Sequence, residues 1–526
     1  MDSTDSLLPA PRQELADVSH QVRGVALTQQ LSQRLRRGQI YMHWAVFGAV
    51  VFLNFLIKWS AAVALQLSLR ESFDFMAKLS QGKQLVYAFA PLLFGRLADV
   101  YSRPLSSALA LLLFIVGSII SAASPNIAVF VAGTVLHTLG MTGIGLLTTL
   151  FIADYTPLKW RGAALSCTHL PTLIMIWAGP LLITAAWRWI YGVVTALVFA
   201  LCAPAIYLLL SAERNHHAPN SSLPTPQPTN LQDILSQMDP AGLVFFTLGF
   251  GLIEYSSITL LDLGDRGSEK YSPGCIAMFV IGLILVFPVF VLWEIHRASF
   301  PLMPGRVLRR KGVLFAILIV FLFQLASAFP DLALMIDFVP IARKLGVIRY
   351  IFAVSRIAYA ASAPLLGVAY YATRRSKPFL IIGCALFVVG CGLWLHAARY
   401  WDRTIDDSMF TSKAYMFTIL VLIGMGSVAI EMSTLISSQA AVTHGDLAIA
   451  TTLIFAWSPI ARSLGALVAR AIYLGSDSDR TKSTILLGLA LGLSLLCLLF
   501  SFIVPNFVLG DKQNAVEEEN AVEEEN

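Results

Sequence analysis

The stretch Gly-Arg-Leu-Ala-Asp-Val-Tyr-Ser-Arg-Pro, residues 95–104, lies between two long apolar runs. The run before it ends in LVYAFAPLLF, and the run after it begins LSSALALLLFIVGSII. Apolar runs of about 18 residues or more are long enough to cross the hydrocarbon core of a bilayer as a helix. We therefore interpret residues 95–104 as a short polar turn between two membrane-spanning helices.

The same pattern recurs along most of the chain. Of its 526 residues, 57% are hydrophobic and 13% are charged, whereas soluble proteins carry about 25% charged residues. This composition predicts an all-α polytopic membrane protein. The net charge of +5 is explained by basic residues that flank membrane spans, so the expected surroundings are a lipid bilayer and not a nucleic acid.

We expect fourteen spans, and the polar segments between them divide the chain into six parts. The spans lie at about 43–65, 82–100, 105–123, 127–150, 163–186, 189–210, 241–260, 274–294, 312–330, 346–371, 378–397, 413–436, 447–472 and 483–504. The expected parts are a cytosolic N-terminal tail at 1–42, an N-terminal six-helix bundle at 43–211, a cytosolic linker at 212–240, two extra transmembrane helices at 241–311, a C-terminal six-helix bundle at 312–504 and an acidic cytosolic tail at 505–526.

Basic residues predict how the spans are oriented. The densest clusters of Lys and Arg, at 306–311 and 374–377, fall in turns on the side of the N-terminus. Cytosolic segments carry an excess of Lys and Arg, so we expect both termini and the turn at 95–104 in the cytosol.

Two sets of charged residues lie at this face. Asp99 ends the second span one turn after Gly95, a residue that lets helices approach closely, and Arg103 begins the third span. Asp154 and Arg161 follow the fourth span in FIADYTPLKWRGAA. Carboxylates and guanidiniums form strong hydrogen-bonded networks. We predict that these five residues form a conformational charge latch, which holds two helix bundles together in one state and releases them in another.

The stretch at 95–104 resembles the loop signature of the major facilitator superfamily, which reads roughly G-x-L-A-D-x-x-G-R-K. The sequence departs from it at Ser102 and Pro104, and the matching residues are Gly95, Leu97, Ala98, Asp99 and Arg103. The resemblance implies the major-facilitator fold, with two six-helix bundles that rock about a central site. The two further central helices would be additions to that fold.

Further motifs resemble the fungal siderophore–iron transporter branch of this superfamily. They lie in and after the fourth span, at the start of the sixth and before the thirteenth. The matching residues are Gly133, Val135, Gly140, Gly143, Ile144, Ile152, Ala153, Asp154, Thr156, Leu158, Trp160, Arg161, Gly162, Trp187, Arg188, Trp189, Tyr191, Gly192, Gln439, Ala440, Val442, His444, Asp446 and Ala448. The resemblance implies an iron–siderophore chelate as the cargo.

Two departures from the branch leave other functions open. The first span carries Lys58 where the branch has tyrosines and an acidic residue, and the last outer loop is only LGSDSDRTKST. The alternative is an exporter of a secondary metabolite, toxin or drug, although the exporter patterns are only half present. A non-transporting sensor on a transporter fold is the third interpretation.

Four ionisable residues inside spans are candidates for a substrate or proton pathway. They are Lys58, Arg356, Glu431 and Arg462, because a charge near a helix centre is costly unless it is paired or functional. Each also has a structural interpretation, as a snorkelling end residue or a helix–helix contact. From charge sign alone, Lys58 and Glu431 could pair, and a buried carboxylate such as Glu431 can take up a proton near neutral pH.

The sequence thus predicts a proton-coupled secondary transporter that works by alternating access, not an enzyme. No nucleotide-binding P-loop, protease-like motif or metal-binding motif is present, so we expect no cofactor and no metal. The expected partners are a small-molecule substrate and protons, the expected state is a monomer, and the expected location is the plasma membrane or a vacuolar or endosomal membrane.

Overall fold

Every predicted span that lies in the described part of the chain coincides with helical structure. The computed structural model describes residues 73–170, 172–173, 187–214, 237–263, 273–339, 348–400, 413–475 and 478–511. The predicted first span at 43–65, with Lys58, lies outside these residues, as do most of the fifth span and most of the linker.

The helices fall into three groups along the chain. The N-terminal half contains α4 (Phe73–Val100), α5 (Arg103–Ala123), α6 (Ile127–Tyr155), α7 (Leu158–Cys167) and α9 (Trp187–Arg214). The extra helix pair consists of α11 (Pro240–Leu263) and the continuous run of α12 (Pro273–Ile284), η2 (Leu285–Val289) and α13 (Phe290–His296). After α14 (Gly305–Leu308), the C-terminal half contains α15 (Lys311–Ala333), η3 (Leu334–Phe338), α17 (Ile348–Thr373), α18 (Lys377–Tyr400), α19 (Lys413–Ala440), η5 (His444–Asp446), α20 (Leu447–Gly475) and α21 (Asp479–Ile503).

By length and composition, nine helices in the described part of the chain could cross a membrane. α5 illustrates the pattern, because one of its faces is apolar and exposed while the opposite face is buried. Leu105, Leu112 and Ile119 follow one another at seven-residue intervals and are exposed, whereas Ser107 and Ser118 are buried. Leucine and isoleucine facing outward suit a lipid environment, so the helix is built for a bilayer.

The start of α5 explains the two departures from the loop signature. Ser102 is the N-cap, and its hydroxyl oxygen accepts a hydrogen bond from the backbone N–H of Leu105 at 3.4 Å. Pro104 lies in the first turn, where a missing backbone N–H costs nothing. Ser102 and Pro104 therefore replace a glycine and a basic residue with a helix-starting pair.

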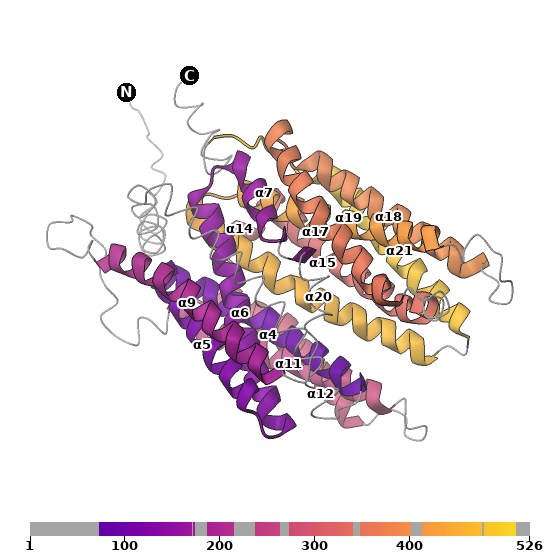
Figure 1. Cartoon of the computed structure of the whole chain (residues 1–526), viewed down its shortest axis with the longest axis horizontal. Coiled ribbons are helices and arrows are strands. Elements are labelled where there is room, and N and C mark those ends of the chain that lie inside the picture. Colours follow the sequence, from indigo (N-terminus) through magenta and orange to yellow (C-terminus); the bar gives the residue numbers. More distant parts are fainter. Residues whose placement is uncertain are drawn as a thin grey trace, which may run out of the picture.

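The two halves lie side by side along a seam made by two helix pairs. α20 packs along α4, and α17 packs along α7 (Figure 1). We call the end of the helices where α4 meets α5 and α17 meets α18 the latch end. Near this end Gly95 lies against α20, where an added Cβ would lie 2.3 Å from Oγ1 of Thr452. A side chain at Gly95 would therefore require Thr452 to move.

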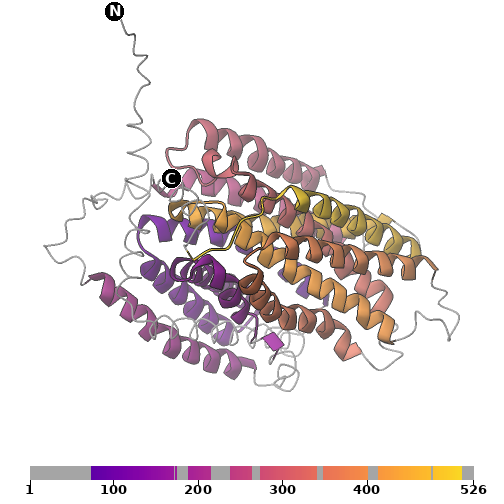
Figure 2. The same ribbon diagram turned by 90° about the horizontal axis from the view of Figure 1, so that it is seen from above.

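The extra helix pair is central in the sequence but lies at the edge of the molecule. α11 packs against α4 and α20, the two helices of one seam pair, and Figure 2 shows the pair as a separate layer beside them. The core residues at this contact are apolar and include Leu92, Phe246, Phe250 and Ile460. The pair thus touches both halves.

After α21, the chain turns back across the latch end. The backbone N–H of Leu509 donates to the carbonyl of Arg374 at 2.8 Å, and that of Lys159 donates to the carbonyl of Gly510 at 3.1 Å. Leu509 is fully buried, and Lys159 forms an ion pair with Asp511. Residues 504–511, here called the C-terminal segment, therefore connect the C-terminal half to α7 (Figure 2), and the acidic tail expected at 505–526 begins with a packed stretch.

Candidate functional site

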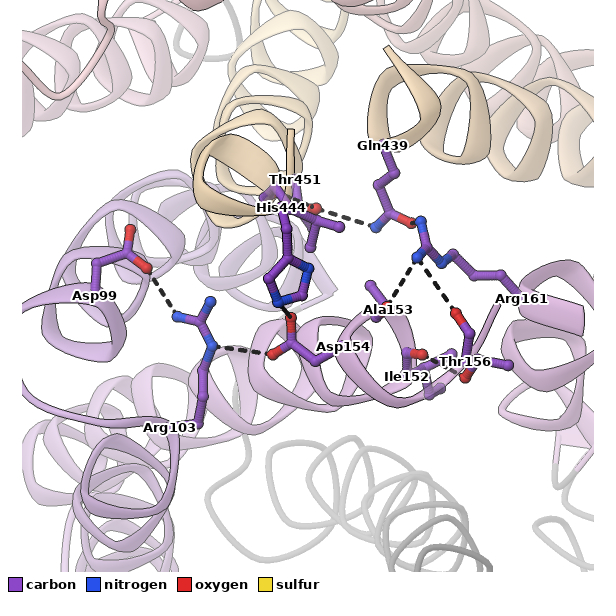
Figure 3. Close-up of polar contacts among 11 residues, drawn as sticks. Asp99, Arg103, Ile152, Ala153, Asp154, Thr156, Arg161, Gln439, His444 and Thr451 are labelled. Atoms are coloured by element: carbon purple, nitrogen blue, oxygen red, sulfur yellow. Dashed lines mark hydrogen bonds and ion pairs between the residues drawn. The ribbon is translucent and has the colours of Figure 1, made fainter. Parts of the chain in front are cut away.

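The predicted charge-latch residues lie together at the latch end. Arg103 donates through one terminal nitrogen to Oδ1 of Asp99 at 2.9 Å and through Nε to Oδ2 of Asp154 at 3.2 Å (Figure 3). The side chains of Arg103 and Asp154 are each 1% exposed. Three helices, α4, α5 and α6, thus share one buried ion network. We call Asp99, Arg103, Asp154 and Arg161 the charged cluster.

Arg161 belongs to the charged cluster and also connects it to the C-terminal half. One terminal nitrogen donates to the carbonyl oxygen of Ala153 at 2.8 Å, and the other donates to the side-chain oxygen of Gln439 at 3.4 Å. Gln439 in turn donates to the hydroxyl of Thr451 at 3.0 Å. Arg161 is fully buried and joins α7 of the N-terminal half to α19 and α20 of the C-terminal half.

A second contact between the halves involves His444. Its Nε2 lies 3.8 Å from Oδ1 of Asp154, and Figure 3 shows the imidazole pointing at that carboxylate from η5. Asp446, in the same short turn, accepts a hydrogen bond from Arg306 at 3.0 Å. Sequence reasoning assigned no role to Gln439, His444 or Asp446, although their spacing in the branch motif had singled them out.

The extra helix pair is also tied to this end. Arg96 on α4 donates to the carbonyl oxygen of Phe300 at 3.1 Å. Glu294 near the end of α13 accepts from the backbone N–H groups of Leu302 and Met303 at 3.0 and 2.9 Å. These bonds fix the connection between α13 and α14, which positions Arg306 beside η5.

These contacts make the latch end a closed junction of buried side chains. Removing one partner from a buried ion pair costs about 3–5 kcal/mol, because the remaining charge stays buried and uncompensated. Separating the halves here would break the contact between Asp154 and His444 and that between Arg161 and Gln439. The arrangement can therefore hold one conformation and would need new partners or water in another.

A second polar group, the central polar cluster, surrounds Glu431 within the C-terminal half. Tyr359 on α17 donates its hydroxyl to Oε2 of Glu431 at 2.5 Å, and Gln324 on α15 donates its amide to Oε1 at 2.9 Å. Arg462 on α20 lies 3.4 Å from the amide oxygen of Gln324. Gln324, Tyr359, Glu431 and Arg462 thus converge from four helices.

The remaining pathway candidates have different surroundings. Arg462 also pairs with Asp331, and the two side chains are 41% and 62% exposed. Arg356 is exposed on α17. Lys58 lies outside the described residues, so its predicted pairing with Glu431 remains a prediction. Within the part of the chain that the structure describes, no cluster of His, Cys, Asp and Glu could hold a metal ion.

The sequence is similar to a known protein family and to several transporters. The sequence profile described as "Major Facilitator Superfamily" matches residues 47–465. A siderophore transporter of Zymoseptoria tritici is 24% identical, over 94% of this chain and 86% of that protein. A low affinity heme transporter of Schizosaccharomyces pombe is 24% identical over 95% and 88%, and siderophore iron transporter 1 of Saccharomyces cerevisiae is 26% identical over 74% and 63%.

Solved structures share the fold at lower sequence identity. The proton:xylose symporter XylE aligns with a TM-score of 0.57 at 13% identity, over 92% of this chain and 99% of that chain. The peptide transporter PepTSo aligns with a TM-score of 0.55 at 14% identity, over 89% and 99%. The fold shared with these transporters is therefore the frame in which both polar clusters lie.

Proposed function

We propose that this chain, which belongs to the Major Facilitator Superfamily, carries iron–siderophore chelates across a membrane by proton-coupled alternating access. Its family makes it a multi-pass membrane transporter of small molecules and not an enzyme. The observation that carries the proposed mechanism is the separation of two polar clusters. The charged cluster joins the halves at one end, and the central polar cluster lies on α15, α17, α19 and α20 of the C-terminal half.

In this mechanism the charged cluster works as the latch. The state that is closed at the latch end is stabilised by Gly95, Asp99, Arg103, Asp154 and Arg161. The basic residues at 306–311 and 374–377 support a cytosolic location of this end. The partners of Asp154 and Arg161 on the other half, His444 and Gln439, are released when that end opens. The plasma membrane is the proposed location.

Glu431 is the proposed proton-binding group. Its carboxylate accepts hydrogen bonds from Tyr359 and Gln324. Arg462 is linked to it through Gln324, whose amide oxygen accepts a hydrogen bond from the guanidinium. A carboxylate inside a helix bundle is costly to keep charged. Gain or loss of the hydrogen bonds from Tyr359 and Gln324 therefore decides whether Glu431 holds a proton.

The names of the relatives support the cargo. Several are siderophore iron transporters and one is a heme transporter, and all of these cargoes are bulky iron chelates. Within the central polar cluster, the guanidinium of Arg462 is 41% exposed, and its N–H donors suit a ligand rich in oxygen acceptors.

The test is uptake in yeast cells that lack their own chelate transporters. Labelled iron–siderophore chelates and labelled hemin are compared, with and without this protein at the cell surface, from about pH 5 to about pH 7. We expect chelate uptake that rises as the medium is acidified. Uptake of hemin alone would transfer the proposal to heme, and uptake of neither ligand by a protein at the surface would contradict both cargoes.

Replacing Glu431 with Gln should remove the pH dependence of uptake, because the amide cannot take up the proton. Glu254→Gln is the matched control, since Glu254 is also a buried carboxylate and is hydrogen-bonded to Ser463 on α20. The control variant should keep the pH dependence. A Glu431→Gln protein that still responds to pH would remove proton coupling through this residue.

Export is the second candidate, and one feature favours it. Only residues 476–478 separate α20 from α21, which leaves little of the outer loop that handles a bulky chelate in the siderophore branch. An exporter would lower the accumulation of a labelled metabolite or drug in the same cells, the opposite sign to uptake.

A further inference from the structure

His169 of the N-terminal half lies against Tyr359 of the central polar cluster. It lies just beyond α7, where its backbone N–H donates to the carbonyl of Ser166 at 3.1 Å and its carbonyl accepts from Thr172 at 3.1 Å. The turn is thus hydrogen-bonded on both sides of the histidine. Sequence reasoning gave His169 no role, because it lies in no charged motif.

The imidazole meets Tyr359 of the other half edge-on. The ring centroids are 5.3 Å apart, and the planes are inclined at 78°. Edge-to-face contacts of this kind are favourable and orient both rings. Because Tyr359 donates its hydroxyl to Glu431 at 2.5 Å, the position of His169 bears directly on that hydrogen bond.

The charged and titratable groups around this contact are few. On α19 the group facing Tyr359 is Glu431, and on α7 the side chains of Lys159 and Arg161 make their contacts at the latch end. On α17 itself Arg356 precedes Tyr359 by one turn and is exposed. Arg462 reaches the cluster from α20 through Gln324.

The contact crosses the seam that alternating access must open. α7 packs along α17, and when the latch end opens, His169 moves with the N-terminal half while Tyr359 and Glu431 stay in the C-terminal half. The hydrogen bond from Tyr359 favours the ionised form of the carboxylate. The presence or absence of His169 beside Tyr359 therefore changes how readily Glu431 takes up a proton.

We propose that His169 is a positioning residue for proton coupling, which holds Tyr359 against Glu431 only while the latch end is closed. This inference rests on the proposed role of Glu431. The N-terminal half would then influence protonation of Glu431 through His169. This influence would be present when the seam is closed at the latch end and absent when it is open.

The test is the pH midpoint of chelate uptake in the yeast assay. His169→Ala should move the midpoint upward by about half a pH unit, and Tyr359→Phe, which removes the donor itself, by about one unit. His169→Phe keeps an aromatic edge and should retain the wild-type midpoint. In the Tyr359→Phe background, His169→Ala should cause no further shift.

His396→Ala is the control, because His396 is an exposed histidine on α18 and should leave the midpoint unchanged. If His169→Ala lowers the maximal rate but leaves the midpoint in place, the residue is only structural and the inference is overturned. If His169→Phe shifts the midpoint as Ala does, the imidazole itself titrates and the positioning role is wrong. If the Glu431→Gln protein keeps its pH dependence, the result contradicts the proposed role of Glu431 in proton coupling and is distinguishable from a failure of the inference about His169.

If no chelate is transported, the same variants are compared in the purified protein. The melting temperature is measured against pH, since a group that changes its proton affinity on folding makes stability depend on pH. We expect the pH midpoints of these stability profiles to rise in the same order as in the uptake assay, from wild type to His169→Ala to Tyr359→Phe. Identical profiles for wild type, His169→Ala and Tyr359→Phe would overturn the inference.

Discussion

Asp154 accepts a hydrogen bond from Arg103 of its own half and faces His444 of the other half. Its carboxylate is therefore shared between a contact that persists throughout the cycle and one that breaks when the halves part. Arg103 is held by Asp99 as well. The ion pair inside the N-terminal half thus keeps Asp154 oriented while its contact with His444 forms and breaks.

Replacing Asp154 with Asn should destabilise the folded protein by about 3 kcal/mol, because Arg103 stays buried with one fewer anion, and it should also weaken the contact with His444 that closes the latch end. Chelate uptake should fall at least tenfold, with the protein still present at the surface. Thr138→Val on the same helix is the control, since that hydroxyl donates only to the carbonyl of Thr134 in its own helix. Equal activity of both variants would show that the ion pair does not limit transport.

Part of the charged cluster could be predicted from spacing alone. Asp99 and Arg103 are four residues apart across a short turn, so their proximity follows from the sequence. The partners of Arg161 do not, because nothing in the local pattern connects residue 161 to Gln439, which lies 278 residues further along the chain. Such contacts arise only when two separately folded halves pack together.

At the scale of elements, the C-terminal segment contributes to closure of the latch end. Val508 pairs with Arg375 as an isolated β-bridge, and Leu509 is buried in a cluster with Leu158, Tyr370 and Ile436. These residues come from both halves. The segment must therefore leave at least one of them before the seam can open at this end.

Asp511→Asn should weaken this closure equally from about pH 5 to about pH 7 and leave the shape of the pH profile in that range unchanged. The hydrogen bond and charge of Lys159 hold the pKa of the Asp511 carboxyl below its usual value. The ion pair is therefore complete from about pH 5 to about pH 7 and is lost only in stronger acid, as pH falls through the lowered pKa. A shifted uptake midpoint in this variant would contradict the assignment of the pH response to Glu431.

Nine helices in the described part of the chain were predictable because each contains an apolar window long enough to span a bilayer. The ends of the helices were less predictable, because a helix can continue beyond the hydrocarbon core of the bilayer. α6 runs to Tyr155 and α15 with η3 to Phe338, beyond the expected ends at 150 and 330. The extensions carry Asp154 and Asp337, two buried carboxylates whose burial is set by packing and not by hydropathy.

At the scale of the whole molecule, the two halves must separate at the latch end in every transport cycle. Trp160 on α7 and Tyr371 on α17 lie across the seam with ring centroids 4.1 Å apart, and both are exposed. They mark a place where the halves can be joined from outside without disturbing the buried contacts.

Cysteines at positions 160 and 371, joined by a short bismaleimide, should abolish uptake while leaving the protein folded. The experiment uses a Cys167→Ser background, because Cys167 is the exposed thiol among the six free cysteines. Each single-cysteine protein is treated in the same way and should keep its activity. Full transport by the cross-linked protein would mean that α7 and α17 do not part.

The position of the extra helix pair could not be predicted from the sequence. Its place between the halves in the chain does not say where it packs, and in the structure it lies at the edge against α4 and α20. The apolar faces of α11 and α12 fit either arrangement equally well. Only the tertiary contacts of Arg96 and Glu294 reveal that the pair is anchored to the latch end.

That anchoring gives the short turn His444–Asp446 a consequence for the surrounding lipid. The turn meets Asp154 on one side and Arg306 on the other, and Arg306 follows the connection that is fixed to the extra helix pair. A helix that is longer than the local hydrocarbon thickness tilts to fit it. A thinner or thicker bilayer that tilts the pair would therefore pull on the same turn that holds the latch end closed, and the rate of transport would depend on membrane thickness.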